Sequence, residues 1–399
     1  MSNWKTVKLS ELGTIVGGAT PATSREEYYN GDIPWLTPKD LAGYSARYIS
    51  RGERNITKAG LESCSAKMLP KGTVLFSSRA PIGYVAIAQN DVCTNQGFKS
   101  IIPNADVNPL FLYYLLKYNK EKIEAVGSGT TFKEVSGATM RNVEVCVPTN
   151  RSVQDKIAVI LDSIDSKIEN NSEMINNLEQ QAIVIFSDLA NNSANKKQLS
   201  NFIKVKHGFA FKGDFISTKD NGVVLVTPGN FKIGGGFKED KCKFFSAEYP
   251  KEYVLKAGSL IVTMTDLSKN VDTLGFSAFV PEFSTRVYLH NQRIGLVELI
   301  NDELPLYYIY WYMRSFEYHM SIVGSASGST VKHTSPKRIL EQYIPVPDRR
   351  ELESKAVILK AINDSISRNN AENNYLSSLR EILLSKLMSG ELDVSDIRP

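Results

Sequence analysis

The sequence contains two copies of one unit, and this internal repeat constrains the architecture more than any other feature. When the chain is shifted by 198 positions, Ala158-Val-Ile-Leu161 falls on Ala356-Val-Ile-Leu359. The match continues without a gap for about thirty residues. A chain of this kind is expected to fold as two related bodies rather than as one.

Shorter matches, separated by small insertions, extend the repeat toward the beginning of each copy. Thr37-Pro38 corresponds to Thr227-Pro228, and Asn95-Gln96 corresponds to Asn291-Gln292. Each copy is a stretch of about 150 residues followed by a segment of about 40. We therefore predict a first globular domain at residues 1–150, a first long segment at 151–192, a second globular domain at 193–347, and a second long segment with a C-terminal tail at 348–399.

The two long segments have the apolar spacing of a coiled coil. Apolar residues recur in steps of four and three from Ile157 to Leu189, and the second copy repeats the pattern with polar breaks at Asn373 and Arg380. A helix of about 35–40 residues is roughly 55–60 Å long, which exceeds what one globular domain needs, so each segment is predicted to be a spacer helix. The predicted seam of an antiparallel pair contains Leu161, Ile164, Ile168, Asn171, Ile175, Leu178, Leu359, Ile362, Ile366, Asn369, Leu376 and Leu383.

Two asparagines interrupt this seam at matching places. Asn171 lies near the middle of its helix, and Asn369 occupies the corresponding position in the other. In an antiparallel pair with coincident centres, we expect the two amides to lie close together, where a slipped register would leave each amide without a partner. In the alternative interpretation the seam is open there, and each asparagine faces solvent or a partner subunit.

The globular parts have the pattern of mixed sheet and helix. Short β-branched and aromatic runs bounded by Gly, Pro, Asn or Asp, such as residues 73–76 and 294–299, are typical of strands. Residues 110–118 and 306–314 have the apolar spacing of helices. The predicted fold class is α+β: two globular domains of mixed β-sheet with helices, separated by two long helices that form an antiparallel coiled coil, in a pseudo-two-fold repeat.

Composition excludes several classes of protein. Apolar residues make up 42% of the chain and charged residues 23%, which is ordinary for a globular protein and argues against disorder. The longest apolar run, residues 304–313, is too short to span a bilayer, and no apolar segment marks the N-terminus for export, so we expect a cytoplasmic protein without a membrane partner. Four scattered cysteines and four histidines predict neither a disulfide framework nor a metal site.

The net charge of +4 is unevenly distributed along the chain. Residues 1–150 carry +4 and residues 193–347 carry +5, whereas residues 151–192 carry −4 and residues 348–399 carry −1. Because a polyanion is attracted to positive surface, it would bind the globular parts and avoid the long helices.

Three kinds of fragment are similar to catalytic motifs but lack essential parts. Asn108-Pro-Leu-Phe111 has a leucine at the second proline of the Asn-Pro-Pro-Phe motif of amino-methyltransferases, and we interpret it as a proline that opens a helix. Pro347-Asp348 with Glu353-Ser-Lys355 has the letters of a nuclease site, but they fall at the start of a helix. The Gly/Ser/Thr stretches at residues 127–131 and 324–330 lack the Gly-Lys-Ser/Thr of a P-loop. We therefore expect no catalytic residues.

Loops at matched places in both copies are rich in side chains that bind base edges and phosphates. The candidate DNA-binding residues of the first copy are Thr20, Thr23, Ser24, Arg25, Lys39, Asp40, Ser78, Arg79, Asn95, Gln96, Lys99, Thr130, Thr131 and Lys133. Those of the second copy are Phe209, Lys212, Asn230, Lys232, Thr265, Lys269, Asn291, Gln292, Arg293, Ser329, Thr330, Lys332 and His333. Pairs shared by both copies are best interpreted as scaffold. Positions that differ, such as Asp40 against Asn230 and Arg79 against Thr265, are better candidates for reading sequence.

The order of motifs along the whole chain resembles the DNA-specificity subunit of type I restriction-modification systems. Ile33-Pro-Trp-Leu-Thr-Pro38, Ser78-Arg-Ala-Pro-Ile-Gly83 and Leu383-Leu-Ser-Lys-Leu-Met-Ser-Gly390 carry the resemblance, together with the duplication. The second copy departs from the Ser-Arg-Ala-x-Ile-Gly pattern, because Thr263-Met-Thr-Asp-Leu267 stands in its place.

The resemblance implies a subunit of a prokaryotic defence system that has no catalysis of its own. Each globular part would be a target recognition domain that reads one half of a bipartite, asymmetric site in double-stranded DNA. The helices would set the spacing and hold two methyltransferase subunits, and motor-nuclease subunits would complete the restriction complex. S-adenosylmethionine, ATP and magnesium would be cofactors of those partners, with none in this chain.

Two other interpretations remain open at the level of the sequence. The first is a single-chain DNA methyltransferase or nuclease with built-in recognition, which a methyl-transfer assay on the purified chain alone would detect. The second is a coiled-coil interaction protein that does not bind DNA. Binding to random duplex that falls steeply with rising salt would argue against the second interpretation.

Overall fold

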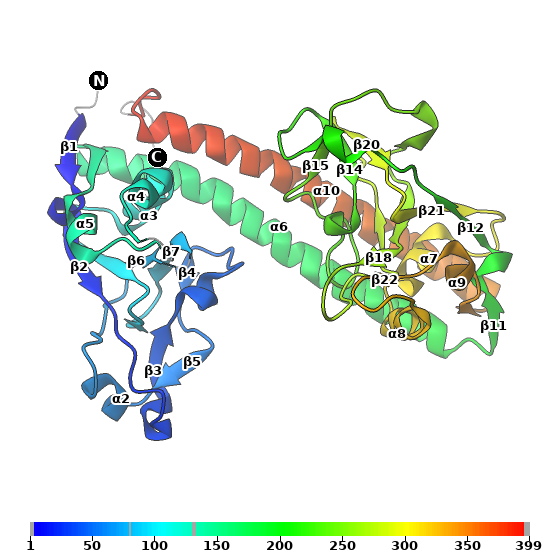
Figure 1. Ribbon diagram of the computed structural model, residues 1–399, viewed down its shortest axis with the longest axis horizontal. Coiled ribbons are helices and arrows are strands. Elements are labelled where there is room, and N and C mark those ends of the chain that lie inside the picture. Colours follow the sequence, from blue (N-terminus) through cyan, green and yellow to red (C-terminus); the bar gives the residue numbers. More distant parts are fainter. Residues whose placement is uncertain (1–3, 80, 130–132, 395–399) are drawn as a thin grey trace. The chain divides into compact units, whose positions relative to one another are not determined.

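The computed structural model describes residues 4–79, 81–129 and 133–394, which form two compact units (Figure 1). Unit 1 comprises Met1–Asn170 with Asn374–Pro399, and unit 2 comprises Asn171–Asn373. The two long helices, α6 (Arg151–Asn191) and α10 (Arg349–Met388), each contribute one half to each unit. Each unit therefore consists of one globular part and a pair of helix halves.

The globular part of unit 1 contains three small sheets. The largest has the strand order β2 (Gly13–Gly17), β9 (Lys99–Pro103), β6 (Val74–Ser78), β7 (Ile82–Ala88), β4 (Tyr48–Ile49). The second has the order β5 (Arg54–Ile56), β3 (Tyr29–Leu36), β8 (Cys93–Thr94), and β1 (Trp4–Lys8) pairs with β10 (Glu144–Pro148). Neighbouring strands are antiparallel except β3 with β8 and β4 with β7, which are parallel.

Five helices complete this part: α1 (Leu9–Leu12), α2 (Lys58–Glu62), α3 (Pro109–Tyr118), α4 (Lys120–Ala125) and α5 (Gly137–Asn142). Helix α3 begins after Asn108, whose side-chain oxygen accepts hydrogen bonds from the backbone N–H of Leu110 (2.8 Å) and of Phe111 (3.1 Å). Such a cap satisfies N–H groups that have no partner inside the helix. The interpretation of Asn108-Pro-Leu-Phe111 as a helix start is thereby confirmed.

The core of unit 1 joins the globular part to the helix halves. Leu161 of α6 and Leu387 of α10 are fully buried in the same cluster as Val145 of β10 and Leu115 of α3. Burial of each such side chain stabilises the fold by about 1.5–3 kcal/mol relative to exposure. The β10 edge and helix α3 therefore hold the first globular part against both long helices.

Unit 2 has four sheets. The first has the order β12 (Ile203–His207), β21 (Ile294–Leu299), β17 (Leu260–Thr263), β19 (Ser277–Phe279). The second has the order β13 (Ile216–Ser217), β15 (Lys243–Phe245), β14 (Val223–Val226), β20 (Val287–His290), β16 (Val254–Leu255). Two ribbons pair β11 (Asn195–Gln198) with β23 (Tyr343–Val346) and β18 (Thr265–Asp266) with β22 (Lys332–His333). The short helices are α7 (Leu306–Tyr312), α8 (Phe316–Ser325) and α9 (Pro336–Leu340).

The repeat in the sequence is also a repeat in topology. In unit 1, β3 lies parallel to β8 with Leu36 opposite Thr94, and in unit 2, β14 lies parallel to β20 with Val226 opposite His290. The order β2-β9-β6-β7 likewise recurs as β12-β21-β17-β19. The predicted α+β class with two related domains and two long helices is confirmed.

The helix halves run antiparallel in each unit. In unit 1, Arg380 of α10 pairs with Asp165 of α6 at 2.8 Å. In unit 2, Lys355 pairs with Asp188, and the Asn171 amide donates to the Asn373 carbonyl oxygen at 3.0 Å. Residues later in α6 therefore pair with residues earlier in α10.

This register differs from the prediction that Asn171 and Asn369 face each other. Asn171 is buried and donates to Glu372 and Asn373, whereas the Asn369 amide lies 3.5 Å from the sulfur of Met174. The observed pairing lies one helical turn away from the predicted one. The ion pairs within each unit explain the shift, because a slip of four residues would separate their charged partners.

The other predicted seam residues lie between the helices and the cores. Leu161, Ile164, Ile175, Leu359 and Ile362 are buried. The remaining members are partly buried: Ile168, Leu178, Ile366, Asn369, Leu376 and Leu383.

Candidate nucleic-acid interface

In unit 1, four loops from distant parts of the sequence meet beside the ends of β6 and β8. The backbone N–H of Ser78 donates to the carbonyl of Gly97 at 2.7 Å, and the Thr20 hydroxyl donates to the side chain of Gln96. Lys99 lies 3.4 Å from a carboxylate oxygen of Glu134, which belongs to the fourth loop. Hydrogen bonds and ion pairs thus hold these loops together.

Arg79 lies at the centre of this loop cluster. Its guanidinium is 3.7 Å from the other carboxylate oxygen of Glu134, and its side chain is 35% exposed. Arg79 also forms a backbone bridge with Glu134, which in turn bridges Ser128. Because a guanidinium has five N–H donors, this single ion pair leaves donors for an external acceptor.

Unit 2 repeats the same frame with different side chains. Thr265 bridges His333 as Arg79 bridges Glu134, and His333 bridges Ser327 in the place of Ser128. The Thr265 hydroxyl lies 3.1 Å from Nδ1 of His333. An ion pair in unit 1 is therefore replaced by a hydrogen bond between a hydroxyl and an imidazole in unit 2.

In the turns after β3 and β14, by contrast, two different residue types accept the same hydrogen bonds. The Asp40 carboxylate accepts hydrogen bonds from the backbone N–H and the hydroxyl of Thr37, at 2.7 and 2.8 Å. The Asn230 side-chain oxygen accepts the same two bonds from Thr227, at 2.9 and 3.2 Å. Asp40 and Asn230 hold a turn, so the difference between them does not support the prediction that they read sequence.

Four predicted contact residues are buried, which does not fit a direct role in DNA binding: Ser78, Asn230, Thr265 and Asn291. The hydroxyl of Ser78 donates to the Gly97 carbonyl, and the side-chain oxygen of Asn291 accepts from the Arg293 N–H. Asn95, partly buried, makes the equivalent bond to the Gly97 N–H. Asn95 and Asn291 thus close local turns, whereas Ser78 joins two segments that are 19 positions apart. Sequence alone does not distinguish these roles of short polar side chains from an outward role.

The remaining predicted residues have at least some exposed surface where the structure describes them. Exposed positions are Thr23, Ser24, Arg25, Lys39, Gln96, Lys133, Phe209, Lys212, Lys269, Gln292, Arg293, Ser329, Thr330 and His333. Partly exposed positions are Thr20, Asp40, Arg79, Asn95, Lys99, Lys232 and Lys332. Thr130 and Thr131 lie outside the described residues.

Lys232 belongs to a loop that faces the long helices. The carbonyl of Gly234, two residues later, accepts a hydrogen bond from Arg314 at 2.8 Å, and Arg314 pairs with Glu179 of α6 at 3.3 Å. Its loop therefore contributes to the docking of this globular part on α6, and DNA binding by the partly exposed Lys232 stays a prediction.

Two basic residues near the loop clusters were missed at the level of the sequence. Arg338 of α9 donates to the Ser327 hydroxyl at 3.1 Å, which places its charge beside the His333 loop. In unit 1, the stem of Lys120 lies against Gly83, where φ is +96° and a Cβ would collide with it. Both residues are on helices, so a search restricted to polar loops could not find them.

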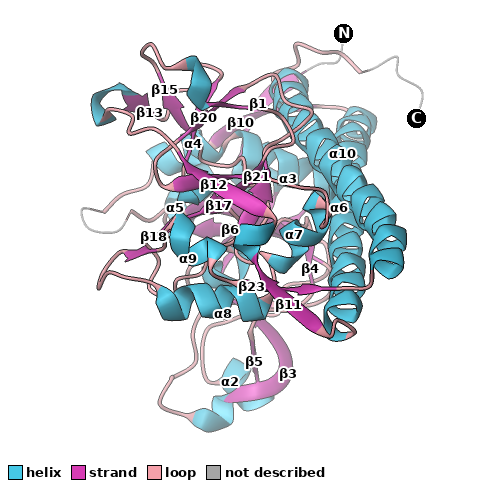
Figure 2. Ribbon diagram, turned by 90° about the vertical axis from the view of Figure 1, so that its right-hand side faces the viewer, coloured by secondary structure: helices cyan, strands magenta, loops and turns pink. Residues whose placement is uncertain are grey.

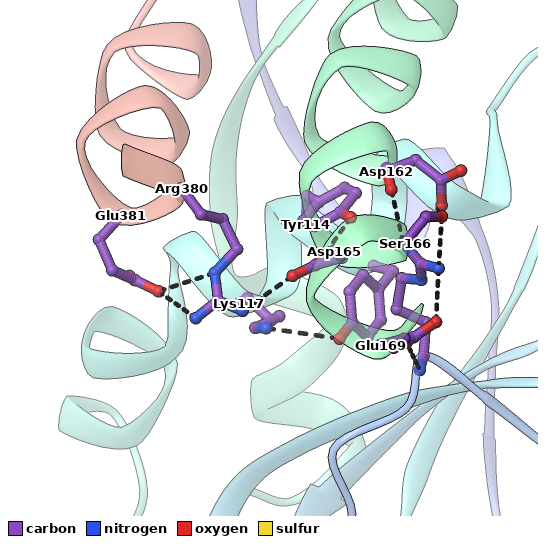
Figure 3. Close-up of polar contacts among 10 residues, drawn as sticks. Tyr114, Lys117, Asp162, Asp165, Ser166, Glu169, Arg380 and Glu381 are labelled. Carbon is purple, nitrogen blue, oxygen red and sulfur yellow. Dashed lines mark hydrogen bonds and ion pairs between the residues drawn. The ribbon is translucent and has the colours of Figure 1, made fainter. Parts of the chain in front are cut away.

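A buried arginine, Arg47, docks the first globular part on α6, and its partners Asp162, Ser166 and Glu169 are labelled in Figure 3. The Arg47 side chain is 6% exposed and pairs with Asp162 at 2.9 Å and Glu169 at 2.8 Å. Its guanidinium also donates to the Ser166 hydroxyl at 3.0 Å. All three partners lie on α6, so one side chain ties the loop before β4 to two turns of the helix.

A second polar group lies deeper in the same interface (Figure 3). The Tyr114 hydroxyl donates to Asp165 at 2.8 Å, and Asp165 pairs with Arg380. Burial raises the pKa of Tyr114, and the neighbouring Asp165 carboxylate raises it further. Burial also lowers the pKa of Lys117, with a further contribution from Arg380. The group links α3, α6 and α10 of unit 1.

Neither unit offers a metal site among its described residues, because no three His, Cys, Asp or Glu side chains come together. The described helices also include none that is long and apolar enough to cross a membrane. The structure therefore defines a protein with two related domains, each of which presents a set of polar and basic loops on a docked scaffold.

The family follows from comparison with known sequences. The chain belongs to the family described as "Type I restriction modification DNA specificity domain", whose sequence model matches residues 1–180 and 191–378. This double match confirms the resemblance and covers both copies of the repeat. The chain is a specificity subunit of the type I restriction-modification class.

Individual relatives agree with this assignment. The chain is 32% identical to the type I restriction enzyme MjaIX specificity subunit of Methanocaldococcus jannaschii, over 99% of this chain and 95% of that protein. It is 28% identical to the HindI specificity subunit of Haemophilus influenzae, over 42% of this chain and 38% of that one. A crystal structure of the S subunit from M. genitalium has the same fold, with a TM-score of 0.63, 16% identity, and coverage of 97% of this chain and 96% of that chain.

Proposed function

We propose that each globular part binds double-stranded DNA and reads one half of a bipartite, asymmetric site. The observation that carries this proposal is one loop frame with two sets of side chains. Arg79 and Glu134 occupy the positions that Thr265 and His333 occupy in the other copy. Thr265 is buried, so the accessible groups on this shared frame are Arg79 in the first copy and His333 in the second. A shared frame that presents different groups is what two readers of different short sequences require.

The two long helices would hold the readers at a fixed spacing and dock two methyltransferase subunits. The buried arginines Arg47 and Arg314 support the first part, because each ties a globular part to α6. We propose that this chain has no catalysis of its own, and that S-adenosylmethionine, ATP and magnesium act in the methyltransferase and motor-nuclease partners. The place of action would be the cytoplasm of a prokaryotic cell, where the DNA is.

A domain exchange tests the proposal. The chain, assembled with its methyltransferase partner, is used to select bound duplexes from a random library, and the bipartite site is read from the enriched sequences. Residues 1–150 are then replaced by the corresponding domain of another specificity subunit. We expect one half-site to change and the other to remain. A change in both half-sites, or enrichment of no bipartite sequence, would contradict the proposal.

Two further measurements address the competing functions. Affinity for random duplex should fall steeply between about 50 and 200 mM salt, because bound basic residues release counterions. Binding without salt dependence would favour a coiled-coil interaction protein. The purified chain alone should transfer no methyl group, whereas the complex with its partner should; transfer by the chain alone would favour a single-chain enzyme.

A further inference from the structure

The two units differ in the connection that follows β6 in unit 1 and its counterpart β17 in unit 2. In unit 1, β6 ends at Ser78 and β7 begins at Ile82, so residues 79–81 connect them. In unit 2, β17 ends at Thr263 and β19 begins at Ser277, so residues 264–276 connect them. The longer segment, residues 264–276, is called the long connection below. Its Thr265 corresponds to Arg79, but it is longer than the three-residue connection of unit 1.

A buried carboxylate fixes the start of the long connection. Asp266 is 3% exposed and accepts hydrogen bonds from the backbone N–H groups of Ser268 and Thr273, both at 2.6 Å. The Thr273 hydroxyl donates to it at 2.7 Å. Although burial acts to raise the pKa of Asp266, these hydrogen bonds outweigh burial and lower it, so the group remains charged. The carboxylate closes the segment between residues 266 and 273 into a compact loop.

The far side of the loop is anchored in the core. Val271 is buried and has a φ of +60°, a conformation that a β-branched residue adopts only when its surroundings impose it. Leu274 is fully buried in the same cluster of side chains as Val271. The Ser268 hydroxyl accepts a hydrogen bond from the Asp272 N–H at 2.9 Å. This loop is therefore held in one conformation rather than free to move.

The tip of this rigid loop presents an apolar side chain to solvent. Leu267, between two anchored residues, is 64% exposed, and Lys269 and Asn270 beside it are exposed as well. The base of the loop pairs with the His333 strand through Thr265, and the Met264 N–H donates to the Arg293 carbonyl at 2.9 Å. Leu267 directly follows β18, which is labelled in Figure 2, and β18 pairs with the strand that contains the predicted positions Lys332 and His333.

We propose that Leu267 contacts the C5-methyl group of a thymine in the second half-site, with Lys269 on a neighbouring phosphate. This inference rests on the proposed function and adds the group that is read. The thymine methyl is the apolar group that base edges present in the major groove, and an exposed aliphatic side chain on a preorganised loop is suited to cover it. A leucine side chain forms no hydrogen bond, so it gains no interaction from the polar groups on the base edges.

Replacement of thymine by deoxyuridine removes this methyl group and nothing else. The complex of the chain with its methyltransferase partner is measured on the selected site, with each thymine of the second half-site replaced in turn. We expect one replacement to weaken binding about fourfold, the effect of about one buried methyl or methylene group. Leu267→Ala should weaken binding to the thymine site by a similar factor and should remove the response to deoxyuridine at that position.

Two variants serve as controls for this measurement. Phe283 is 61% exposed in unit 2, outside the loop cluster, and Phe283→Ala should keep both the affinity and the response to deoxyuridine. Lys269→Ala should weaken binding equally at every sequence and reduce its salt dependence, while the deoxyuridine response remains. Each variant is first shown to enrich the first half-site, so loss of folding is separated from loss of one contact.

Three outcomes would overturn the inference. In the first, no thymine of the second half-site responds to deoxyuridine in the unaltered protein. In the second, the response persists in Leu267→Ala. In the third, a 2-aminopurine base placed in the second half-site becomes fluorescent when the unaltered protein binds but not when Leu267→Ala binds, and deoxyuridine in place of thymine does not change this. That result would show that Leu267 is inserted between two bases and unstacks them. If the unaltered complex enriches no bipartite site at all, the proposed function itself fails, which is a different result.

Discussion

The two globular parts are built on one frame, and the comparison between them separates structural residues from candidate readers. Asp40 and Asn230 differ in type but hold the same turn, whereas Arg79 and Thr265 occupy the same bridge and make different contacts. A difference in sequence is therefore a weaker sign of specificity than a difference in contacts. Because both copies lie in one chain, each serves as a reference for the other.

The largest expected effect comes from changing the distance between the two readers. Four residues inserted after Asn170 and four after Asn373 lengthen both helices by about 6 Å where the units meet in sequence. Binding to the original site should fall by about 10²–10⁴-fold, because only one half can be engaged at a time. Selection should then recover both half-sequences with a gap wider by about one to three base pairs at ~3.4 Å each.

Deletion of four residues from each helix should narrow the gap by the same amount. As a control without a length change, alanine at the exposed Gln180 and Gln181 should leave the gap as it was. An unchanged gap in both length variants would show that the helices do not determine the distance between the half-sites.

The second comparison concerns the two docking arginines. Arg47→Ala leaves Asp162 and Glu169 without their partner, and we expect a loss of about 3 kcal/mol in the free energy of unfolding, at the low end for broken buried pairs because both carboxylates are a third exposed. Arg314→Ala leaves one carboxylate, that of Glu179, and should lower the free energy of unfolding less.

Denaturant unfolding of the two variants measures the difference. Lys39→Ala breaks an exposed ion pair with Glu53 and should change stability little, which makes it the matched control. Equal losses in Arg47→Ala and Lys39→Ala would mean that the buried pairs do not hold the first domain on its helix.

The third comparison is between Arg79 and its counterpart Thr265. Arg79→Ala should weaken binding by about 1–3 kcal/mol and relax preference at one base pair of the first half-site. Thr265→Val keeps the shape of a buried side chain and should leave the second half-site unchanged. Both are measured by selection and by affinity on single-base variants. Uniform weakening by Arg79→Ala would make it a phosphate contact, and no effect would make it a turn residue.

The smallest effect is the pH dependence that Asp266 contributes to the stability of unit 2. The pKa of Asp266 is lowered in the folded protein, so the stability it contributes is present above the ordinary aspartate pKa of about 3.9 and is lost as the pH falls through the lower folded value. Asp266→Asn should therefore lower the free energy of unfolding at neutral pH, and this difference should shrink in acid. A difference that stays constant with pH would show that the charge is not what the loop requires.

The sequence was sufficient for features that depend on repetition and periodicity. The shift that superposes residues 158–161 on 356–359 predicted two related domains, and the four-and-three spacing predicted the long helices observed as α6 and α10. Both kinds of signal involve many residues at once, so single exceptions such as Arg380 do not hide them.

Features that depend on single side chains were less accessible. The register of Asn171 is fixed by ion pairs within unit 2 such as Asp188 with Lys355, whose partners are 167 positions apart. Whether a short polar residue faces outward or closes a turn is likewise decided by neighbours far along the chain, as for Ser78 and Gly97. The anchoring of the long connection by Asp266 has no periodic pattern and becomes visible only in the folded chain.

The division of the two long helices between the units sets an order of events during synthesis. Unit 2 is one continuous stretch, Asn171–Asn373, whereas unit 1 also needs residues 374–399. A ribosome adds about 5–20 residues per second from the N-terminus, so the first globular part emerges first but waits for its second helix until the other unit is complete. During this interval Leu161, which is fully buried beside Leu387 in the finished core, has no α10 to cover it. The domain that is made first is therefore the one that is finished last.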